Sequence, residues 1–516
     1  MPRPDPRISN DDPDERLADL QYRHDFEYAT GHNVSADYEL DNAGQCARLF
    51  TTWIPKTDVE KVVASEIAGE YAIETLAQVS DVSNLKAMLD PMVEAYQDWI
   101  LQQKSALTSQ SLGGEGSQRH DTANSLLHSA NKTNERLRKG INAMDDLQVF
   151  QAFKLANQAI AISIRQRNSH NSEKTPQEFE SPKWRPFQLA FILNNIAGIA
   201  NPLDRDREIV DLLFFPTGGG KTEAYLGLAA FTLILRRLRD QKAEGSAGLS
   251  VLMRYTLRLL TLDQLGRAAT LICALETIRQ ENVDILGKHR FEIGLWVGQT
   301  ATPNRMGAKG DKNPDSARKR TMDYKSDSNL FPSPIPLENC PWCGTRFTKD
   351  SFHLLPTPDA PLDLQVSCIN RKCLFGAKNP LPIIAVDDQI YRKLPAFMIA
   401  TVDKFANLPW VGETGKLFGK VSHYDEKTGN FYSEADTHKI GKPLQQYLPP
   451  PDLIIQDEMH LISGPLGTMV GLYETAIDAL CARTLTHSPF PIEGEGSKIV
   501  RPKIVASTAT VRRATH

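Results

Sequence analysis

Two groups of residues in this chain have types and spacing that favour chemistry. The stretch FFPTGGGKTEAYLG, which starts at Phe214, puts three glycines next to a lysine and a threonine. Farther along, the chain carries a CxxC pair and a CxxxxC pair of cysteines. Bare backbone amides beside a lysine can hold a phosphate group, and four thiolates can hold a metal ion. The sequence therefore predicts an anion site and a metal site.

The glycine-rich stretch lies between a predicted strand and a predicted helix. Residues 209–215 are mostly apolar, and residues 222–235 have apolar side chains at helical spacing. The turn between them leaves backbone N–H groups free at the positive end of a helix, where a triphosphate such as ATP can bind. Lys221 would reach the β- and γ-phosphates, and the Thr222 hydroxyl would ligate Mg²⁺. The predicted nucleotide-binding residues of the turn are Thr217, Gly218, Gly219, Gly220, Lys221 and Thr222.

A second polar group follows an apolar run late in the chain. The stretch PDLIIQDEMHLISG, from Pro451, passes from apolar residues into Asp457, Glu458 and His460. Carboxylates at a strand end suit two tasks beside a triphosphate, since Asp457 can hold Mg²⁺ and Glu458 can orient the attacking water. His460 is predicted to couple this site to its neighbours. Taken alone, these residues also fit an ordinary solvated strand end.

Four of the seven cysteines are grouped in CPWCG and CINRKC, and three are scattered. This distribution is typical of a metal site rather than of the disulfide framework of a secreted protein. The glycine after the first pair lets backbone amides approach the sulfurs, and four thiolates make a closed tetrahedral zinc site. We therefore expect a structural zinc ion. Its predicted ligands are Cys340, Cys343, Cys368 and Cys373.

The elements that must position these groups are predicted to form a parallel α/β sheet. From Lys183 onward, predicted strands alternate with predicted helices. Ligands of such sheets bind outside the carboxyl ends of the strands, so the glycine-rich turn and the acidic pair are expected to face each other there. The predicted strands are 209–215, 249–254, 292–297, 396–401, 452–457 and 502–507.

The rest of the chain is expected to form a helical N-terminal domain and an insertion. Residues 1–178 carry stretches of helical periodicity, interrupted by a polar segment at 105–125 that is predicted to be an exposed, disordered loop. The sheet domain then covers residues 179–516. Within it, residues 302–390 are predicted to be an insertion that carries the zinc site and begins with a basic, disordered loop.

The composition is that of a soluble globular protein. The 516 residues include 41% hydrophobic and 24% charged residues, and the length predicts two or three domains. The chain lacks an apolar run of about 18 residues and starts with MPRPD rather than a signal core, so a cytoplasmic location without membrane contact is expected. The net charge of −4 leaves any nucleic-acid binding to local basic patches.

The ordered motifs resemble the first RecA-like domain of a DExH-box superfamily 2 helicase. PTGGGKT departs from the strict GxxxxGK[ST] pattern, whose first glycine would stand at Phe215, and is similar to the form that these helicases use. The phrases FPTGGGKTEAYLGLAAF, WRPFQLAFIL, IATVDKFANL and IIQDEMHLISGPLG are similar, more narrowly, to the helicase component of the DISARM phage-defence system. This resemblance covers residues 180–516 well and the N-terminal part loosely. It implies an ATP-dependent DNA translocase that works with a companion protein, DrmB, and a cytosine methyltransferase against foreign DNA.

The resemblance also implies roles for further residues. Gln188, beside Phe187, resembles the Q motif, whose amide contacts adenine. STAT, with Thr508, Ala509 and Thr510, resembles the SAT motif, whose short hydroxyls link ATP hydrolysis to movement. Residues after two strands resemble segments that contact a sugar–phosphate backbone, with solvated helix caps as the alternative. These predicted nucleic-acid contacts are Arg254, Thr256, Arg258, Thr401 and Lys404.

A second RecA-like domain is expected to follow these motifs in such helicases. That domain supplies an arginine finger and the other half of the ATP cleft, so these 516 residues alone are expected to bind nucleotide poorly and hydrolyse it slowly. Three kinds of function stay open: a DNA motor, an ATP-dependent switch or scaffold that loads a partner, and a small-molecule kinase. The STAT strand argues against the kinase, and RNA in place of DNA is a variant of the first.

Overall fold

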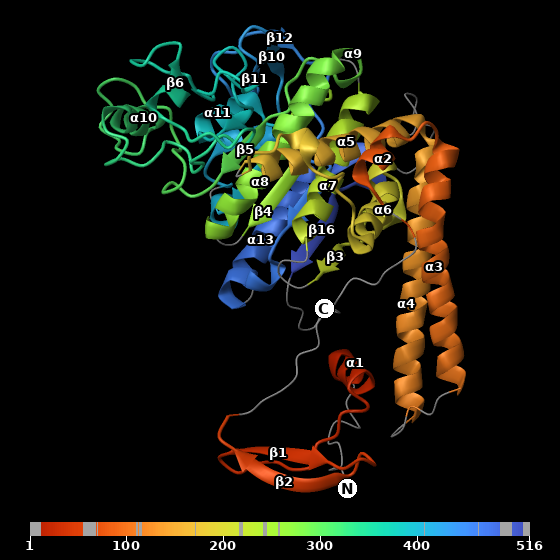
Figure 1. Ribbon diagram of the computed structural model, residues 1–516. Coiled ribbons are helices and arrows are strands. Elements are labelled where there is room, and N and C mark those ends of the chain that lie inside the picture. Colours follow the sequence, from red (N-terminus) through yellow and green to blue (C-terminus); the bar gives the residue numbers. More distant parts are fainter. Residues whose placement is uncertain are drawn as a thin grey trace. The chain divides into compact units, whose positions relative to one another are not determined.

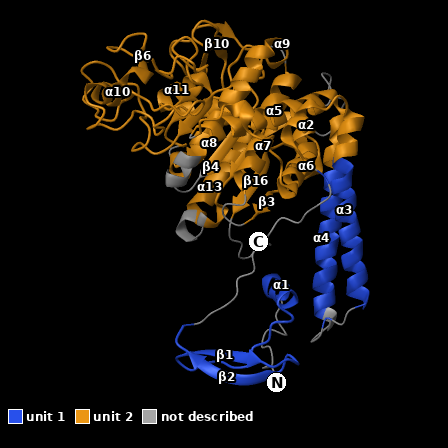
Figure 2. Cartoon of the chain, in the orientation of Figure 1, with its two compact units in different colours: residues 1–69, 89–138, 511–516 blue, residues 70–88, 139–510 orange. Residues whose placement is uncertain are grey.

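The computed structural model describes most of the chain, and the described residues divide between two compact units, residues 1–69, 89–138 and 511–516, and residues 70–88 and 139–510 (Figure 2). The sheet and the helices that pack on it belong to the second unit. The boundary predicted at residue 178 is therefore wrong, because helices on both sides of it share one core. The described residues are 12–54, 69, 71–109, 112, 116–170, 172–215, 220–240, 245–255, 258–406, 408–462, 464–485 and 498–508.

The described part of the first unit contains a β-hairpin and the larger parts of two long helices. The hairpin strands pair antiparallel. The two long helices lie side by side, and Asn134 Nδ2 donates a hydrogen bond of 2.7 Å to Gln97 Oε1 between them (Figure 1). The elements are α1 (Pro13–Gln21), β1 (Ser35–Leu40), β2 (Cys46–Thr52), α3 (Val82–Ser109) and α4 (Gly116–Asn142).

Two predictions for this region are wrong. The all-helical N-terminal domain is interrupted by the hairpin of β1 and β2. The loop predicted at 105–125 is helical on both sides of a short gap, since α3 continues to Ser109 and α4 starts at Gly116. Serine, glutamine and threonine lower helix stability by only a few tenths of a kcal/mol each. A polar stretch without apolar periodicity therefore did not exclude an exposed helix.

Among the described residues, seven strands of the second unit form one sheet in the order β3-β16-β13-β4-β9-β5-β8 (Figure 1). Every neighbouring pair is parallel. This confirms the predicted α/β class, and six of the strands fall within or beside the predicted ranges. The strands are β3 (Asp211–Phe214), β4 (Val251–Tyr255), β5 (Ile293–Trp296), β8 (Ile383–Ile384), β9 (Phe397–Thr401), β13 (Leu453–Gln456) and β16 (Lys503–Thr508).

Helices bury the sheet and position its carboxyl edge. α7, which follows β3, is buried from Lys221 to Leu238 except at Glu223, and α5, α6 and α8 pack against it. A core cluster with Trp296, Met398 and Ile454 joins the sheet to α11 and α13. Besides α10, described below, the helices of this unit are α2 (Ile73–Gln78), α5 (Leu147–Ser169), α6 (Pro186–Ala200), α7 (Lys221–Arg239), α8 (Arg258–Glu281), α9 (Val283–Leu286), α11 (Asp387–Lys393), α12 (Val402–Phe405) and α13 (Gly464–Cys481).

The segment between β5 and β9 carries the four cysteines and is tied into the sheet. The predicted insertion, residues 302–390, lies between β5 and β9, and its strand β8 pairs with β5. The basic loop predicted to be disordered contains α10 (Ala317–Ser326), which Ser316 caps through its side chain. The remaining strands are β6 (Phe352–Leu355), β7 (Asp363–Val366), β10 (His423–Asp425), β11 (Asn430–Tyr432), β12 (Lys442–Pro443), β14 (Arg483–Leu485) and β15 (Lys498–Val500).

Candidate active site and metal centre

The glycine-rich turn joins β3 to α7. Gly220, the residue before α7, has a φ of +87°, a left-handed conformation that favours glycine. A Cβ at this position would lie 2.7 Å from Gln188 Nε2, so a side chain would also crowd α6. Lys221 Nζ donates a hydrogen bond to the carbonyl oxygen of Phe215 and thus connects the two ends of the turn. The predicted phosphate ligands Thr217, Gly218 and Gly219 lie outside the described residues.

The acidic pair follows β13 at the same edge of the sheet. β3, β16 and β13 are parallel neighbours, so their carboxyl ends lie together. Asp457 is 3% exposed, and its Oδ2 accepts a hydrogen bond of 2.7 Å from the Tyr225 hydroxyl. The oxygen of that hydroxyl also lies 3.2 Å from Thr222 Oγ1. The fold thus brings the two predicted Mg²⁺ ligands, Thr222 and Asp457, to one phenol group.

Lys221, Asp457 and Glu458 lie close enough to influence one another's charge. Burial lowers the pKa of Lys221, and the negative charges of Glu458 and Asp457 oppose that shift. Burial raises the pKa of Glu458, and the charge of Asp457 adds to the rise, while His460 and Lys221 counteract it. One cation beside two carboxylates can hold a phosphate group and its metal ion between them.

His460 connects the acidic pair to the end of β16. Its Nδ1 lies 3.0 Å from Thr508 Oγ1 and 3.3 Å from Glu458 Oε2. Glu458 has a φ of +49°, which is uncommon for a residue other than glycine and is found most often at functional sites. His460 and Thr508, both predicted to couple the site to its surroundings, are therefore in direct contact. Ala509 and Thr510 lie outside the described residues.

The buried amide of Gln188 is engaged with the backbone around the turn. Its Nε2 donates a hydrogen bond of 2.7 Å to the Gly220 carbonyl oxygen, and its Oε1 accepts one of 2.8 Å from the N–H of Arg185. The neighbouring Phe187 stacks on Phe215, with ring centroids 4.2 Å apart. Gln188 thus holds the turn against α6, and its contact with adenine stays a prediction.

Three of the predicted nucleic-acid contacts are buried inside the protein. Arg254 is 4% exposed and forms an ion pair with a glutamate of α13. Thr401 is 3% exposed. Lys404 is 5% exposed, and its ammonium donates hydrogen bonds to two neighbouring side chains. Their contact with a nucleic acid stays a prediction.

Lys404 is buried because residues that precede β9 in the sequence pack over it. Lys404 Nζ donates hydrogen bonds to Asp387 Oδ2 at 2.5 Å and to Asn304 Oδ1 at 2.8 Å, so the segment between β5 and β9 covers the end of β9. Burial raises the pKa of Asp387 to about 6, although the positive charge of Lys404 opposes the rise. Of the other two candidates, Thr256 and the side chain of Arg258 lie outside the described residues.

Two residues of the site escaped the sequence reasoning. Tyr225 contacts both Asp457 and Thr222, and Gln264 Nε2 of α8 donates a hydrogen bond of 3.3 Å to Thr222 Oγ1. Tyr225 could have been predicted from its spacing, because it stands three residues after Thr222 and so lies on the same face of the helix. Gln264 had no such signal, since its contact depends on how α8 packs beside α7.

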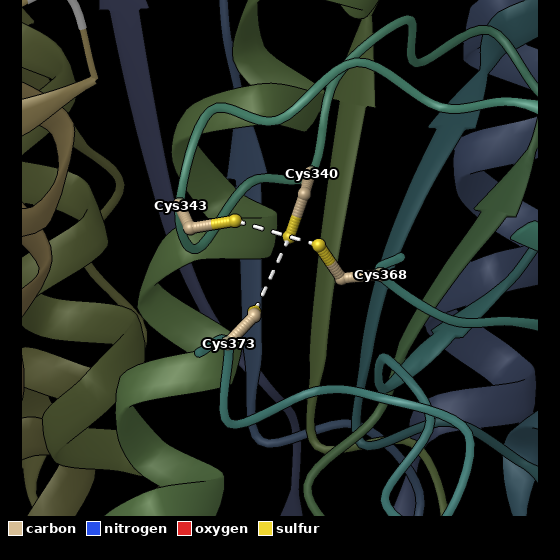
Figure 3. Close-up of side chains that lie close together, drawn as sticks. All are labelled: Cys340, Cys343, Cys368 and Cys373. Carbon is tan, nitrogen blue, oxygen red and sulfur yellow. Dashed lines mark hydrogen bonds between the residues drawn. The ribbon is translucent and has the colours of Figure 1, made fainter. Parts of the chain in front are cut away.

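The four cysteines converge from two short loops (Figure 3). Their sulfurs lie within 4.8 Å of one another, with 3.9 Å between Cys340 and Cys373 and 3.4 Å between Cys343 and Cys368. A tetrahedral zinc site with bonds of about 2.3 Å separates its sulfurs by roughly 3.8 Å. The cluster can therefore hold a metal ion such as zinc, with the predicted ligand set.

Backbone amides support the sulfurs of the second loop. The N–H groups of Asn370 and Phe375 donate to Cys368 Sγ at 3.4 Å and to Cys373 Sγ at 3.5 Å. Such bonds stabilise thiolates, as the groups around a metal ion commonly do. Burial raises the pKa of Cys368, which favours the protonated thiol in the absence of a metal ion.

The first cysteine loop is fastened to the helices that cover the sheet. Thr270 of α8 donates a hydrogen bond of 2.8 Å to the Pro341 carbonyl oxygen, and His170 Nε2 lies 3.2 Å from the Trp342 carbonyl oxygen. Gly344 has a φ of +72°, and a Cβ there would lie 3.1 Å from His170 Cβ. The centre is therefore packed onto the sheet unit, as a structural metal site would be.

Comparison with known proteins gives one strong similarity. No family model matches the chain. The chain is 34% identical over 532 aligned residues to the DISARM protein DrmA of Bacillus paralicheniformis. The alignment includes 96% of this chain and 45% of that relative, so the chain spans about half the length of the relative that it matches. Among the described residues, every helix is too short or too polar to cross a lipid bilayer. Along 96% of its residues, the chain is thus similar to part of the DISARM protein DrmA.

Proposed function

We propose that this chain forms the first, RecA-like motor domain of an ATP-dependent DNA translocase that acts in DISARM phage defence. The similarity to DrmA supports the defence role. Parallel strands that carry motif residues at their carboxyl ends support a motor of the superfamily 2 helicase kind. Because the chain spans 45% of DrmA, the activity, substrates and partners of the whole protein all belong to this proposal.

One observation carries the ATP-dependent part of the proposal. The Tyr225 hydroxyl contacts both Thr222 Oγ1 and Asp457 Oδ2, although Tyr225 and Asp457 stand 232 positions apart in the sequence. Oxygen ligands are what Mg²⁺ prefers, and a threonine after a lysine plus an aspartate after a neighbouring strand are the groups that hold it in nucleotide triphosphatases. These residues fit a bound Mg²⁺.

The residues of the cluster then divide the work of ATP hydrolysis. Lys221 would bind the β- and γ-phosphates, and Thr222 and Asp457 would hold a metal ion, whose charge would offset that of the transferred phosphoryl group. Glu458 orients the attacking water. Its raised pKa makes it a stronger base than an exposed glutamate. His460 passes the change at Glu458 on to Thr508 through the contacts at its Nδ1.

The cysteine centre has a structural part in this proposal. Zinc bound to Cys340, Cys343, Cys368 and Cys373 would be closed to water, and four thiolates leave no open position for catalysis. Its contacts with Thr270 and with His170 would hold the segment between β5 and β9 against the sheet.

The partners proposed for the whole protein are DNA, either single-stranded or duplex with a single-stranded end, the companion protein DrmB, and a second RecA-like domain. The proposed location is the cytoplasm. RNA in place of DNA is a variant of this proposal.

The burial of Arg254, Thr401 and Lys404 favours a second candidate function. With these residues inside the protein, the described part of the chain offers fewer contacts to a nucleic-acid backbone than the motif pattern indicated. An ATP-dependent switch or scaffold, which loads a partner without unwinding a duplex, would need fewer of them. A strand-displacement assay on the full-length protein separates the two, because only the translocase releases the displaced strand.

The direct test is the ATPase rate of the full-length protein, measured in parallel with single-stranded DNA, duplex DNA and RNA. We expect DNA to stimulate turnover, and we expect Lys221→Ala to lower it by at least about 100-fold because the phosphates lose their cation. Lys420→Ala, at an exposed lysine away from the cluster, is the matched control and should keep the wild-type rate. Stimulated turnover that survives Lys221→Ala would show that the phosphate-binding turn is misassigned.

A further inference from the structure

Tyr225, which belongs to none of the sequence motifs, contacts both proposed metal ligands at the carboxyl edge of the sheet. Tyr225 lies on α7, is 1% exposed and reaches the edge of the sheet with its hydroxyl. That hydroxyl donates to Asp457 Oδ2 at 2.7 Å, and its oxygen lies 3.2 Å from Thr222 Oγ1. A phenol placed between two ligands of a divalent cation can set how both of them present their lone pairs.

We propose that Tyr225 is a positioning residue of the metal site, whose hydroxyl holds Thr222 and Asp457 in the arrangement that accepts Mg²⁺. This inference rests on the proposed ATP-dependent function. It attributes part of the site's affinity for Mg²⁺ to the hydroxyl of Tyr225.

Counting protons shows how the arrangement works. The phenol has a single proton and a carboxylate has none to give, so the shorter contact, to Asp457 Oδ2, takes the phenol proton. The 3.2 Å contact must then be made by the hydroxyl proton of Thr222, which points at the Tyr225 oxygen. Gln264 Nε2 occupies one lone pair of Thr222 Oγ1 at 3.3 Å. One lone pair of Thr222 is left, and it is free for a metal ion.

The same hydroxyl fixes the carboxylate. Asp457 Oδ2 is held by Tyr225, and Asp457 Oδ1 accepts a hydrogen bond of 3.0 Å from the N–H of Glu458. Each oxygen keeps a further lone pair for a ligand. Without the phenol, the Thr222 hydroxyl could turn its proton toward the metal position, and the carboxylate would lose one of its two anchors. The loss would fall on metal binding, since the Tyr225 hydroxyl contacts the two residues proposed to hold the metal ion.

The test is Tyr225→Phe in the full-length protein, which keeps the buried ring and removes the oxygen. ATP turnover is measured against free Mg²⁺ at a fixed, saturating ATP concentration. We expect the half-saturating Mg²⁺ concentration to rise about tenfold, or about 1.4 kcal/mol, with kcat at saturating Mg²⁺ within about threefold of wild type. Binding of a fluorescent ATP analogue in EDTA should stay unchanged. A merely structural role would weaken nucleotide binding with and without metal alike.

Tyr391→Phe is the matched control. Tyr391 is also buried, and its hydroxyl oxygen accepts a hydrogen bond of 3.1 Å from Trp296 Nε1, away from the nucleotide cluster. This variant also removes one buried hydrogen bond, yet it should keep the half-saturating Mg²⁺ concentration within about twofold of wild type.

The outcomes distinguish a failure of this inference from a failure of the proposed ATP-dependent function. If the wild-type protein neither binds nor hydrolyses ATP in a Mg²⁺-dependent way, the proposed function fails first. If the wild type is active and Tyr225→Phe has the wild-type Mg²⁺ dependence, the inference is overturned and the function stands. If Tyr225→Phe does not fold, Gln264→Met takes its place: a rise of about threefold in half-saturating Mg²⁺ supports the hydrogen-bond arrangement around Thr222, and no rise overturns it.

Discussion

The nucleotide cluster and the cysteine centre are assembled in opposite ways. The nucleotide cluster consists of Lys221, Thr222, Tyr225, Asp457, Glu458 and His460. Its bond between Tyr225 and Asp457 spans 232 positions of sequence, whereas the sulfur contact between Cys340 and Cys373 spans 33. The first cluster exists only because the parallel sheet puts three strand ends side by side. The second needs two short loops and, by our proposal, a metal ion.

Because the two sites are assembled differently, different changes should disrupt them. A local metal centre fails when its ion is removed, and a cluster held by a sheet survives that loss as long as the strands stay paired. A point change in the nucleotide cluster should in turn leave the cysteine centre intact. The Cys368 and Asp457 variants test this directly, because both regions are measured in each of them.

The largest effect is expected from loss of the proposed zinc ion. Structural zinc sites contribute about 10–16 kcal/mol of apparent binding free energy, so Cys368→Ser should unfold the loops between β5 and β9. Zinc content measured by mass spectrometry should fall from one ion per chain to none, and limited proteolysis should cut within residues 302–390. ATP binding should persist more weakly. A wild-type protein purified without any metal would contradict the assignment of the centre.

Breaking the buried pair of Lys404 and Asp387 should have the next largest effect. Lys404→Met leaves an uncompensated carboxylate, which is expected to lower the free energy of unfolding by about 3–5 kcal/mol. Chemical denaturation measures the change. Lys309→Met is the control, because the Lys309–Asp359 pair is 70% and 61% exposed and should contribute less than about 1 kcal/mol. Equal losses in the two variants would mean that Lys404 is not buried as described.

Asp457→Asn should damage the nucleotide cluster alone. The variant keeps the shape of the side chain and removes the charge that would hold Mg²⁺, so ATP turnover should fall by about 100- to 1,000-fold. Zinc content and proteolytic stability should match those of the wild-type protein. A loss of zinc in this variant would show that the two regions are coupled, against the comparison drawn above.

His460→Ala is expected to have the smallest effect. It removes the contacts with Thr508 and Glu458, each worth about 1 kcal/mol, so DNA-stimulated turnover should fall about tenfold while basal turnover changes little. The ratio of stimulated to basal rate is the measurement. An equal fall in both rates would place His460 in hydrolysis itself rather than in coupling.

The sheet and the main residues of both clusters could be predicted because their signals are local. Short apolar runs define the strands, and the glycines, the acidic pair and the cysteines stand directly beside those runs or within one loop. Asp457 and Thr222 could be expected to meet because the ends of parallel strands share an edge. Cys340 and Cys343 could be expected to bind one ion because two residues separate them.

What the sequence did not show depends on contacts between distant segments. Nothing near Lys404 indicates that Asp387 and Asn304 will cover it, so a cation after a strand looked like a nucleic-acid contact. Gln264 reaches Thr222 only through the packing of α8. The hairpin of β1 and β2 was missed because none of its strand residues is buried, so its sequence shows little alternation between apolar and polar residues.

The pairing of β8 with β5 limits how this protein can be dissected. A researcher who deleted residues 302–390 to obtain a smaller motor would also delete β8, and β5 would become the outer strand of the sheet with its row of amide and carbonyl groups open to other molecules. β5 is short, apolar and buried along its whole length, the kind of segment that joins neighbouring chains into aggregates when it is uncovered. A trimmed version should therefore keep residues 381–390 and shorten only the loops before them.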